Sequence, residues 1–206
     1  MTLDLPAVLP VLSTATGRFI LVPYEPSHAE LLADVLGHAE VWAQGYGDGE
    51  PLPAGRDELL SFIERRYVGL PVFSIFTSGL DPRFVGTTGL TDSQADTERV
   101  KIGRTVVAPE FWGSMVNHEV KLALLGWLFD CGAGRIEADV DPRNSRSITS
   151  LCRFGFTVEG TRRRSSQRFD GTWRDIVILS LLREEWVDVA ERAQTTLAGW
   201  TSPVAA

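Results

Sequence analysis

The order of elements in the middle of the chain constrains the fold more than any other feature of the sequence. Residues 98–107 alternate as a strand does, and residues 117–132 follow with the apolar spacing of a helix. Residues 135–141 predict a second strand, and residues 144–155 predict a short helix that ends at a glycine. A strand–helix–strand–helix run of this kind predicts one mixed sheet with helices packed against it.

Segments on either side of this run add elements to the same sheet. The other predicted strands are residues 18–26, 71–78 and 83–92 and a hairpin over residues 156–182. The other predicted helices are residues 27–42, 56–69 and 183–200. The chain has 206 residues, a length that suits one domain with a substantial core. We therefore expect residues 1–206 to form a single domain of the α/β (α+β) class, with a twisted sheet of about seven strands and helices on both faces.

Charge and composition exclude several classes of protein. The formal net charge is −7, so we expect no nucleic-acid partner, because phosphate contacts need clustered basic residues. No apolar run approaches the roughly 20 residues of a membrane helix, and the N-terminal residues lack a basic start. Cys131 and Cys152 are expected to be reduced, buried thiols, and no metal-ligand spacing is found. These features predict a cytoplasmic protein with no membrane contact and no metal.

The turn between the strand at 98–107 and the helix at 117–132 carries no charge. Its sequence is Trp112-Gly113-Ser114-Met115-Val116-Asn117. The first N–H groups of a helix have no partner within the helix, and the helix dipole is positive at that end. A turn of this kind can hold an anion on backbone amides alone.

Together with its flanking segments, the turn gives the chain a resemblance to the GNAT acyltransferases. Within that family it resembles the ribosomal-protein N-terminal acetyltransferases of the RimJ/RimL type. The resemblance covers residues 18–186, and it rests on four segments in order: VGTTGL (85–90), KIGRTVVAPEFWGSMVNHEVKLALLGWLFD (101–130), RIEADVDPRNSRSITSLCRFGFTVEG (135–160) and FDGTWRDIVILSLLREEW (169–186).

The resemblance implies a mostly antiparallel sheet that splays between its fourth and fifth strands. It also implies acetyl transfer from acetyl-CoA to a primary amine, by direct attack in a ternary complex. The pantetheine arm would lie on the backbones of Val106 and Val107. The diphosphate would bind the turn, whose residues would be Trp112, Gly113, Ser114, Met115, Val116 and Asn117. Met115 departs from the family, which usually has glycine there, and glycine would let the backbone come closer to a ligand.

Three further residues take roles from the resemblance, each with a structural alternative. Asn144 would bind the pantetheine arm, although asparagine is also a leading helix N-cap residue. In the RimJ/RimL-type branch, a serine at the position of Ser147 would assist the departing thiolate; alternatively, Ser147 would satisfy local backbone. The tyrosine that many family members use as the acid is absent, since no tyrosine follows Tyr67. Asp139 is our candidate general base, although its strand face could simply be solvated.

The acceptor is less defined than the donor. Asp48 and Glu50, in a Gly/Pro-rich loop, would meet a cationic acceptor, either a protein N-terminus or a small amine. Trp186 and Trp200 on the terminal helix are candidates to cover a homodimer interface. The alternative function is a catalytically degenerate coenzyme A-binding sensor or interaction protein of the same fold.

Overall fold

The computed structural model describes residues 2–43 and 45–200, with the side chains of residues 48 and 49 excepted. Its strands are β1 (Leu12–Ser13), β2 (Phe19–Pro23), β3 (Val72–Thr77), β4 (Phe84–Gln94), β5 (Arg99–Val107), β6 (Arg135–Val140), β7 (Thr157–Gln167) and β8 (Trp173–Leu182). Its α-helices are α1 (Ala29–Leu36), α2 (Ala39–Ala43), α3 (Arg56–Tyr67), α4 (Val116–Asp130), α5 (Ser145–Phe154) and α6 (Arg183–Gly199). Short 3₁₀ turns lie at Pro26–His28, Tyr46–Gly49, Ala95–Thr97 and Pro109–Phe111.

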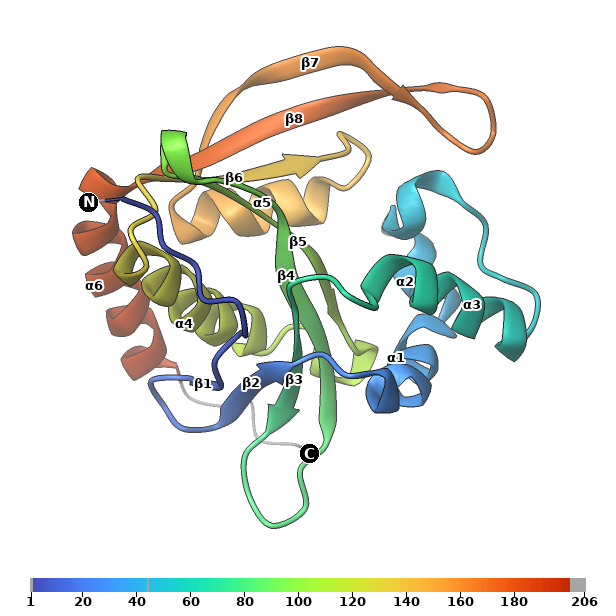
Figure 1. Ribbon diagram of the computed structural model, residues 1–206, viewed down its shortest axis with the longest axis horizontal. Helices are drawn as coiled ribbons and strands as arrows, with labels where there is room; N and C mark the ends of the chain where they lie inside the picture. The colour runs from blue at the N-terminus through green and yellow to red at the C-terminus, as the bar shows by residue number, and fades with distance from the viewer. Residues whose placement is uncertain (1, 44, 201–206) are drawn as a thin grey trace.

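The strands form one sheet in the order β1-β2-β3-β4-β5-β6-β8-β7 (Figure 1). Every neighbouring pair is antiparallel except β5 and β6, which are parallel and are joined through α4. The predicted mixed, mostly antiparallel sheet is therefore confirmed. The eighth strand is β1, which has only two residues and was not predicted.

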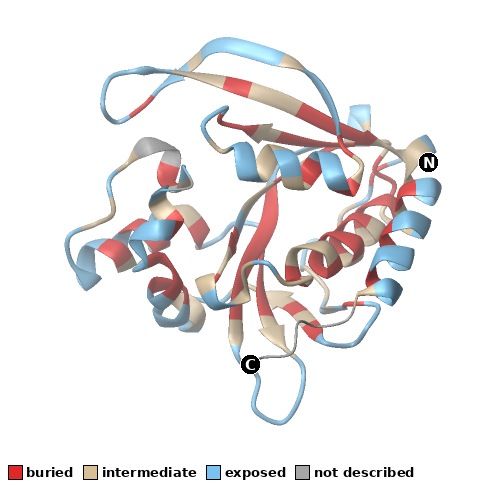
Figure 2. Cartoon of the chain, turned by 180° about the vertical axis from the view of Figure 1, so that it is seen from behind, coloured by how far each residue is buried: buried red, intermediate tan, exposed pale blue. Residues whose placement is uncertain are grey.

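Helices cover both faces of the sheet, as predicted. Helices α1 and α3 pack on one side with the outer ends of β3 and β5, in a cluster centred on Leu32, Phe62 and Tyr67. Helices α4, α5 and α6 pack on the other side, in the larger core cluster. Figure 2 shows α4 buried along most of its length while the outer face of α6 is exposed.

The helix predicted over residues 27–42 is wrong in its extent. Helix α1 ends at Leu36, and the separate helix α2 begins at Ala39, because Gly37 is a poor helix residue and sits at the C-cap of α1. The carbonyl of Leu36 accepts a hydrogen bond from the Trp42 indole N–H at 2.6 Å. The break lets α2 turn back towards the sheet and bring the following loop close to β5.

The parallel pair β5–β6 separates along its length. Cα pairing runs from Arg99 with Arg135 to Ile102 with Ala138 and does not continue beyond that point. Immediately after it, β5 contains a β-bulge, because Arg104 and Thr105 lie opposite a single residue of β4. Arg104 has a left-handed φ of +50°, which is uncommon outside glycine. The splay was predicted between the fourth and fifth of seven strands, which correspond to β5 and β6 here, and it is confirmed. The bulge turns β5 away from β6.

The rest of β5 is held against β4 by a close approach at Gly86. Gly86 has a φ of +150°, and a Cβ added there would lie 2.0 Å from the carbonyl oxygen of Val106. We expect Gly86→Ala to lower the free energy of unfolding by at least about 2 kcal/mol, through backbone strain and steric overlap. Urea or thermal denaturation measures this difference.

Gly160→Ala on β7 is the matched control, because a Cβ at Gly160 meets nothing within 4 Å. We expect the control to change stability by less than about 1 kcal/mol. Equal stability of the two variants would show that the approach of β4 to β5 does not constrain the sheet.

Candidate functional site

A cavity of about 760 Å³ occupies the gap between β5 and β6. It is lined by the last residues of both strands, by the turn before α4, by the facing sides of α4 and α5, and by the loop after α2. Of the residues predicted to form the site, ten line it: Val106, Val107, Trp112, Gly113, Ser114, Met115, Asn117, Asp139, Asn144 and Ser147. Val116 is buried in the core instead, and Glu50 is not among the residues that line the cavity.

The two valines of β5 present different groups to the gap. Ala108 N–H donates to the Val85 carbonyl at 2.8 Å, and Val107 lies opposite Gly86. By the alternation of an antiparallel ladder, Val106 then directs its N–H and C=O towards β4, and Val107 directs its own towards the gap. The Val107 carbonyl accepts a hydrogen bond from the Trp112 indole N–H at 2.7 Å, which leaves its N–H facing the cavity.

The turn before α4 adopts the conformation that its sequence allows. Gly113 has a φ of +76°, which glycine tolerates, and a Cβ there would meet nothing within 4 Å. Met115 has a φ of −84° and a ψ of 3°, which any residue adopts. The departure from glycine at Met115 therefore introduces no backbone strain.

Some amides of this turn have internal partners and others do not. Ser114 N–H donates to the Phe111 carbonyl and Val116 N–H donates to the Ser114 hydroxyl, both at 3.3 Å. Among the described residues, no acceptor is found for the N–H groups of Gly113, Met115 and Asn117. The expectation that all amides of residues 113–117 are free is corrected to these three, since Ser114 closes the turn on itself.

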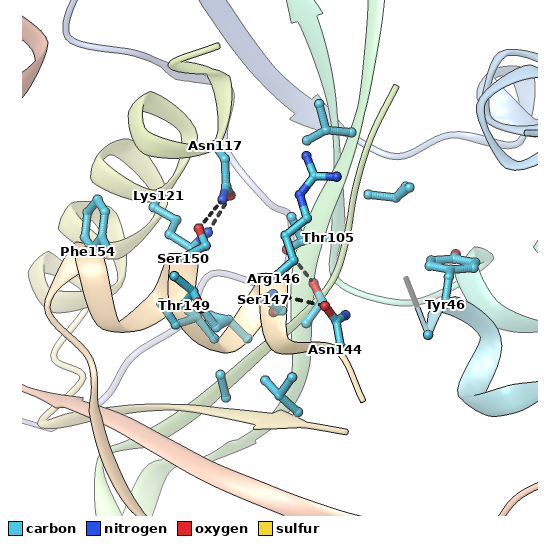
Figure 3. Close-up of a pocket in the computed structure, with 18 of the residues that line it drawn as sticks. Tyr46, Thr105, Asn117, Lys121, Asn144, Arg146, Ser147, Thr149, Ser150 and Phe154 are labelled. Atoms are coloured by element: carbon cyan, nitrogen blue, oxygen red, sulfur yellow. Dashed lines mark hydrogen bonds between the residues drawn. The ribbon is translucent and has the colours of Figure 1, made fainter. Parts of the chain in front are cut away.

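The N-terminus of α5 faces the turn across the cavity. The Asn144 Oδ1 accepts the Ser147 N–H at 3.0 Å, so Asn144 is the N-cap of α5 (Figure 3). This bond uses only the carbonyl end of the amide, and the NH₂ group has no acceptor in the described part of the chain. Arg146 lies over the Trp112 ring, with its guanidinium carbon 4.2 Å from the ring centroid, and so connects α5 to the turn.

Asp139 on β6 is only partly engaged. Its Oδ2 accepts from Lys101 Nζ at 2.7 Å and lies 3.8 Å from Arg162. Its Oδ1 is buried and has no hydrogen-bond partner. The neighbouring carboxylates differ, since Asp141 binds Arg168 at 2.8 Å and Glu137 binds Arg135 at 2.6 Å. Asp139 is therefore the one of the three that keeps an unused acceptor beside the cavity.

Lys121 on α4 lies one helical turn after Asn117 and reaches the same cavity. Its side chain is buried, and its ammonium donates to the Asn117 Oδ1, while the Asn117 NH₂ donates to the Ser150 hydroxyl at 2.7 Å (Figure 3). Burial lowers the pKa of Lys121 to about 7, and no carboxylate counters that effect.

The loop after α2 forms the opposite wall of the cavity. Tyr46 lines the cavity, and its hydroxyl is hydrogen-bonded to that of Tyr67. Burial raises the pKa of Tyr46 well above its ordinary value, so this hydroxyl stays neutral. Glu50 lies outside the cavity, 3.7 Å from Arg66, and the Asp48 side chain lies outside what the structure describes.

Basic side chains outnumber acidic ones on the cavity wall. Five basic side chains line it (Arg104, Lys121, Arg146, Arg153 and Arg174) against two acidic ones (Asp139 and Asp141). A chain with an overall charge of −7 thus concentrates cations around this gap. A cavity with free amides at a helix start and an excess of basic side chains suits an anionic ligand.

The sequence profile described as an acetyltransferase (GNAT) domain matches residues 18–157, more than half of the chain. The chain belongs to the GNAT acetyltransferase family. The eight-stranded open sheet and its splayed parallel pair are the GNAT fold, which binds acetyl-CoA.

Solved structures of acetyltransferases share this fold. A GCN5-related N-acetyltransferase from Brucella melitensis aligns with a TM-score of 0.85 and 21% identity over 97% of this chain and 90% of its own. A candidate acetyltransferase from T. thermophilus aligns with a TM-score of 0.78 and 26% identity over 93% of this chain and 100% of its own. Mycobacterium smegmatis RimJ, in a structure described as a complex with CoA-disulfide, aligns with a TM-score of 0.67 and 22% identity over 96% of this chain and 98% of its own.

Sequence reasoning missed several residues of this GNAT site. Lys121 carries a signal that could have been used, because a lysine within the apolar run Val120–Leu125 of a buried helix is unusual. Tyr46 and Arg104 carried no such signal, since their position depends on the break after α1 and on the bulge in β5.

No cluster of three potential metal ligands occurs among the described residues. Within the same residues, no helix has both the length and the apolar character to span a membrane.

The buried Lys121 predicts a pH-dependent stability of the protein without ligand. Its pKa is lower in the folded chain than in the unfolded chain, so the unfolded chain binds more protons between about pH 7 and pH 10. The stability contributed by this group is therefore lowest at and below pH 7 and rises as the pH increases to about 10.

Lys121→Met should raise the midpoint of thermal unfolding at pH 7 by roughly 2 °C or more, since it removes the cost of burying a charge. The difference from the unsubstituted protein should shrink towards pH 10. Differential scanning calorimetry at several pH values measures it. If Lys121→Met were less stable than the unsubstituted protein, and by the same amount at pH 7 and at pH 9.5, the idea of a costly charge at this position would be contradicted.

Proposed function

We propose that this GNAT protein is an N-acetyltransferase that moves an acetyl group from acetyl-CoA to a primary amine. The observation that carries the proposal is the set of three unpartnered N–H groups, of Gly113, Met115 and Asn117, beside a cation-rich gap in the sheet. The residues present fit the coenzyme, because N–H groups at a helix start that have no internal acceptor can donate to an anionic ligand. These amides, together with the helix dipole of α4, would hold the diphosphate.

The rest of the coenzyme would follow the splayed strand. The Val107 N–H faces the gap and would donate to the pantetheine arm, in the manner of an added strand. The Asn144 NH₂ would hold the arm from the other side, while its carbonyl continues to cap α5. Val106 would support the arm through its buried side chain, because its backbone groups are used by β4.

When bound, the coenzyme supplies the thioester whose acetyl group is transferred. The acceptor nitrogen forms a bond to the carbonyl carbon, and the carbon–sulfur bond breaks. Asp139 would accept a proton from the acceptor amine at its unused Oδ1, and the Ser147 hydroxyl would donate to the departing sulfur. Holding both reactants in one cavity would supply much of the rate enhancement.

The acceptor in this proposal is a protein N-terminus, as in the RimJ/RimL-type branch. Asp139 and Asp141 line the cavity, and of the two it is Asp139 that has an oxygen without a partner; basic side chains outnumber acidic ones around the cavity. A polyamine carries several positive charges and would be repelled by such a wall. A protein N-terminus carries one positive charge, which the Asp139 carboxylate alone can neutralise.

A coenzyme-binding protein without catalysis is the second candidate function. The contact between Lys101 and Asp139 favours it, because an ion pair holds the only candidate base among the cavity carboxylates. The two functions differ in thiol release, since a pure binder releases no coenzyme A from acetyl-CoA in the presence of amines.

Acetyl-CoA binding by calorimetry, followed by thiol release with a panel of peptides and small amines, tests the proposal. We expect binding and peptide-dependent release. Absence of binding at millimolar ligand would refute both candidate functions, and binding without release would favour the second.

Ser147→Ala should lower kcat by about tenfold or more with little change in KM, because the hydroxyl acts only as the sulfur departs. Ser145→Ala is the matched control, since Ser145 lies on the same first turn of α5. Equal kcat values for the two variants would remove Ser147 from the chemistry.

A further inference from the structure

Two buried charges lie on the same helix, and only one of them has an ionic partner. Glu119 is bound by Arg18 at 2.5 Å and by the Thr16 hydroxyl, so its charge is compensated within the protein. Lys121, two residues later, is also buried, but its contact is the neutral Asn117. A buried charge without a counter-charge is costly, and such groups are retained where a ligand supplies the missing charge.

The direction of the Lys121 side chain identifies where that ligand would lie. Side chains on a helix lean towards its N-terminus, and Lys121 reaches back one turn to Asn117, whose own N–H is one of the three unpartnered amides of the phosphate turn. Figure 3 shows Lys121, Asn117 and Ser150 gathered between α4 and α5 at the edge of the cavity. An ammonium has three donors, and one is used in this arrangement.

We propose that Lys121 is a phosphate-binding residue that takes up a proton when the coenzyme diphosphate binds. This inference rests on the proposed function, because it needs the coenzyme in the gap. Lys121 would be largely neutral in the free protein near pH 8, and the arriving phosphate charge would make its protonated form the stable one. The proton comes from solvent and is held on Nζ, with no covalent bond formed or broken.

The other charges around the cavity do not replace Lys121 in this role. The charged and titratable side chains that share the cavity with it are Tyr46 in the loop after α2, His118 on α4, Arg146 and Arg153 on α5, Arg104 on β5, Asp139 on β6, Asp141 just after β6, and Arg174 on β8. The arginines remain charged at all relevant pH values, and each aspartate already has a basic partner. His118 is the other group that could take up a proton on binding, because burial lowers its pKa below 6.5 and leaves the imidazole neutral at pH 7 and above in the free protein.

The test is calorimetric titration of the full chain with coenzyme A in HEPES and in Tris at pH 7 and pH 8. The difference in heat between buffers gives the number of protons taken up. For a lysine with a pKa of about 7 when free, we expect the uptake to rise from about half a proton at pH 7 towards about one at pH 8. Binding should weaken as the pH rises above 7.

Variants separate Lys121 from other sources of protons. Lys121→Met should lower the proton uptake by about half a proton at pH 7 and about one at pH 8. It should also weaken coenzyme A binding by about tenfold or more at pH 6.5. Lys121→Arg keeps a fixed charge, so it should bind without this uptake. His118→Gln is the matched control and should retain it, and proton exchange by the coenzyme's own phosphates should persist in every variant.

The outcomes distinguish the two proposals. If coenzyme A does not bind the unsubstituted protein, the proposed function fails. If it binds and the uptake is unchanged in Lys121→Met, or disappears in His118→Gln, the function stands and the role of Lys121 is refuted. Equal affinity of the unsubstituted protein and Lys121→Met at pH 6.5 would also refute it.

Discussion

The interruption of pairing between β5 and β6 is the constraint on which the rest of the site depends. Two parallel strands share four paired positions and then separate, because the bulge at Arg104 and Thr105 turns β5 away. Separation leaves the inner edge of β5 without a neighbouring strand, and an unpaired edge carries N–H and C=O groups that need partners. It also opens the space into which the starts of α4 and α5 direct their amides and side chains. One extra residue in a strand therefore creates both the volume and the polar surface of the cavity.

Charge is distributed unequally on the two sides of that gap. Glu137 on β6 is bound by Arg135 of the same strand and by Arg99 of β5. Asp141, just after β6, is bound by Arg168 and Arg174, and these contacts hold the hairpin β7–β8 to the centre of the sheet. On the helical side, Lys121 has no such partner. Paired charges stabilise the arrangement of elements, whereas the unpaired one is a cost that a ligand can offset. This contrast separates side chains that build the fold from those that could serve the site.

The sequence predicted features that depend on local patterns and missed those that depend on contacts between distant segments. The mixed sheet, the helices on both faces and the hairpin follow from periodicity and turn residues, and they are confirmed. The turn at residues 112–117 was found because its lack of charge is visible in the sequence, but the use of the Ser114 hydroxyl within that turn was not. The strand β1 was missed because two residues become a strand only through their pairing with β2. The apolar run around Lys121 indicates a buried position, but its contacts at the cavity depend on α5 lying beside α4, which no local rule predicts.

The hydrogen bond from the Trp112 indole to the Val107 carbonyl joins the phosphate turn to the end of the splayed strand. The Arg146 guanidinium over the same indole extends this connection to α5. Three segments that meet the coenzyme in our proposal are thus fastened to one another before any ligand arrives. Preorganisation of this kind reduces the entropy lost on association. Capture of the donor should then require little rearrangement of the main chain, and diffusion and electrostatic attraction would govern its speed.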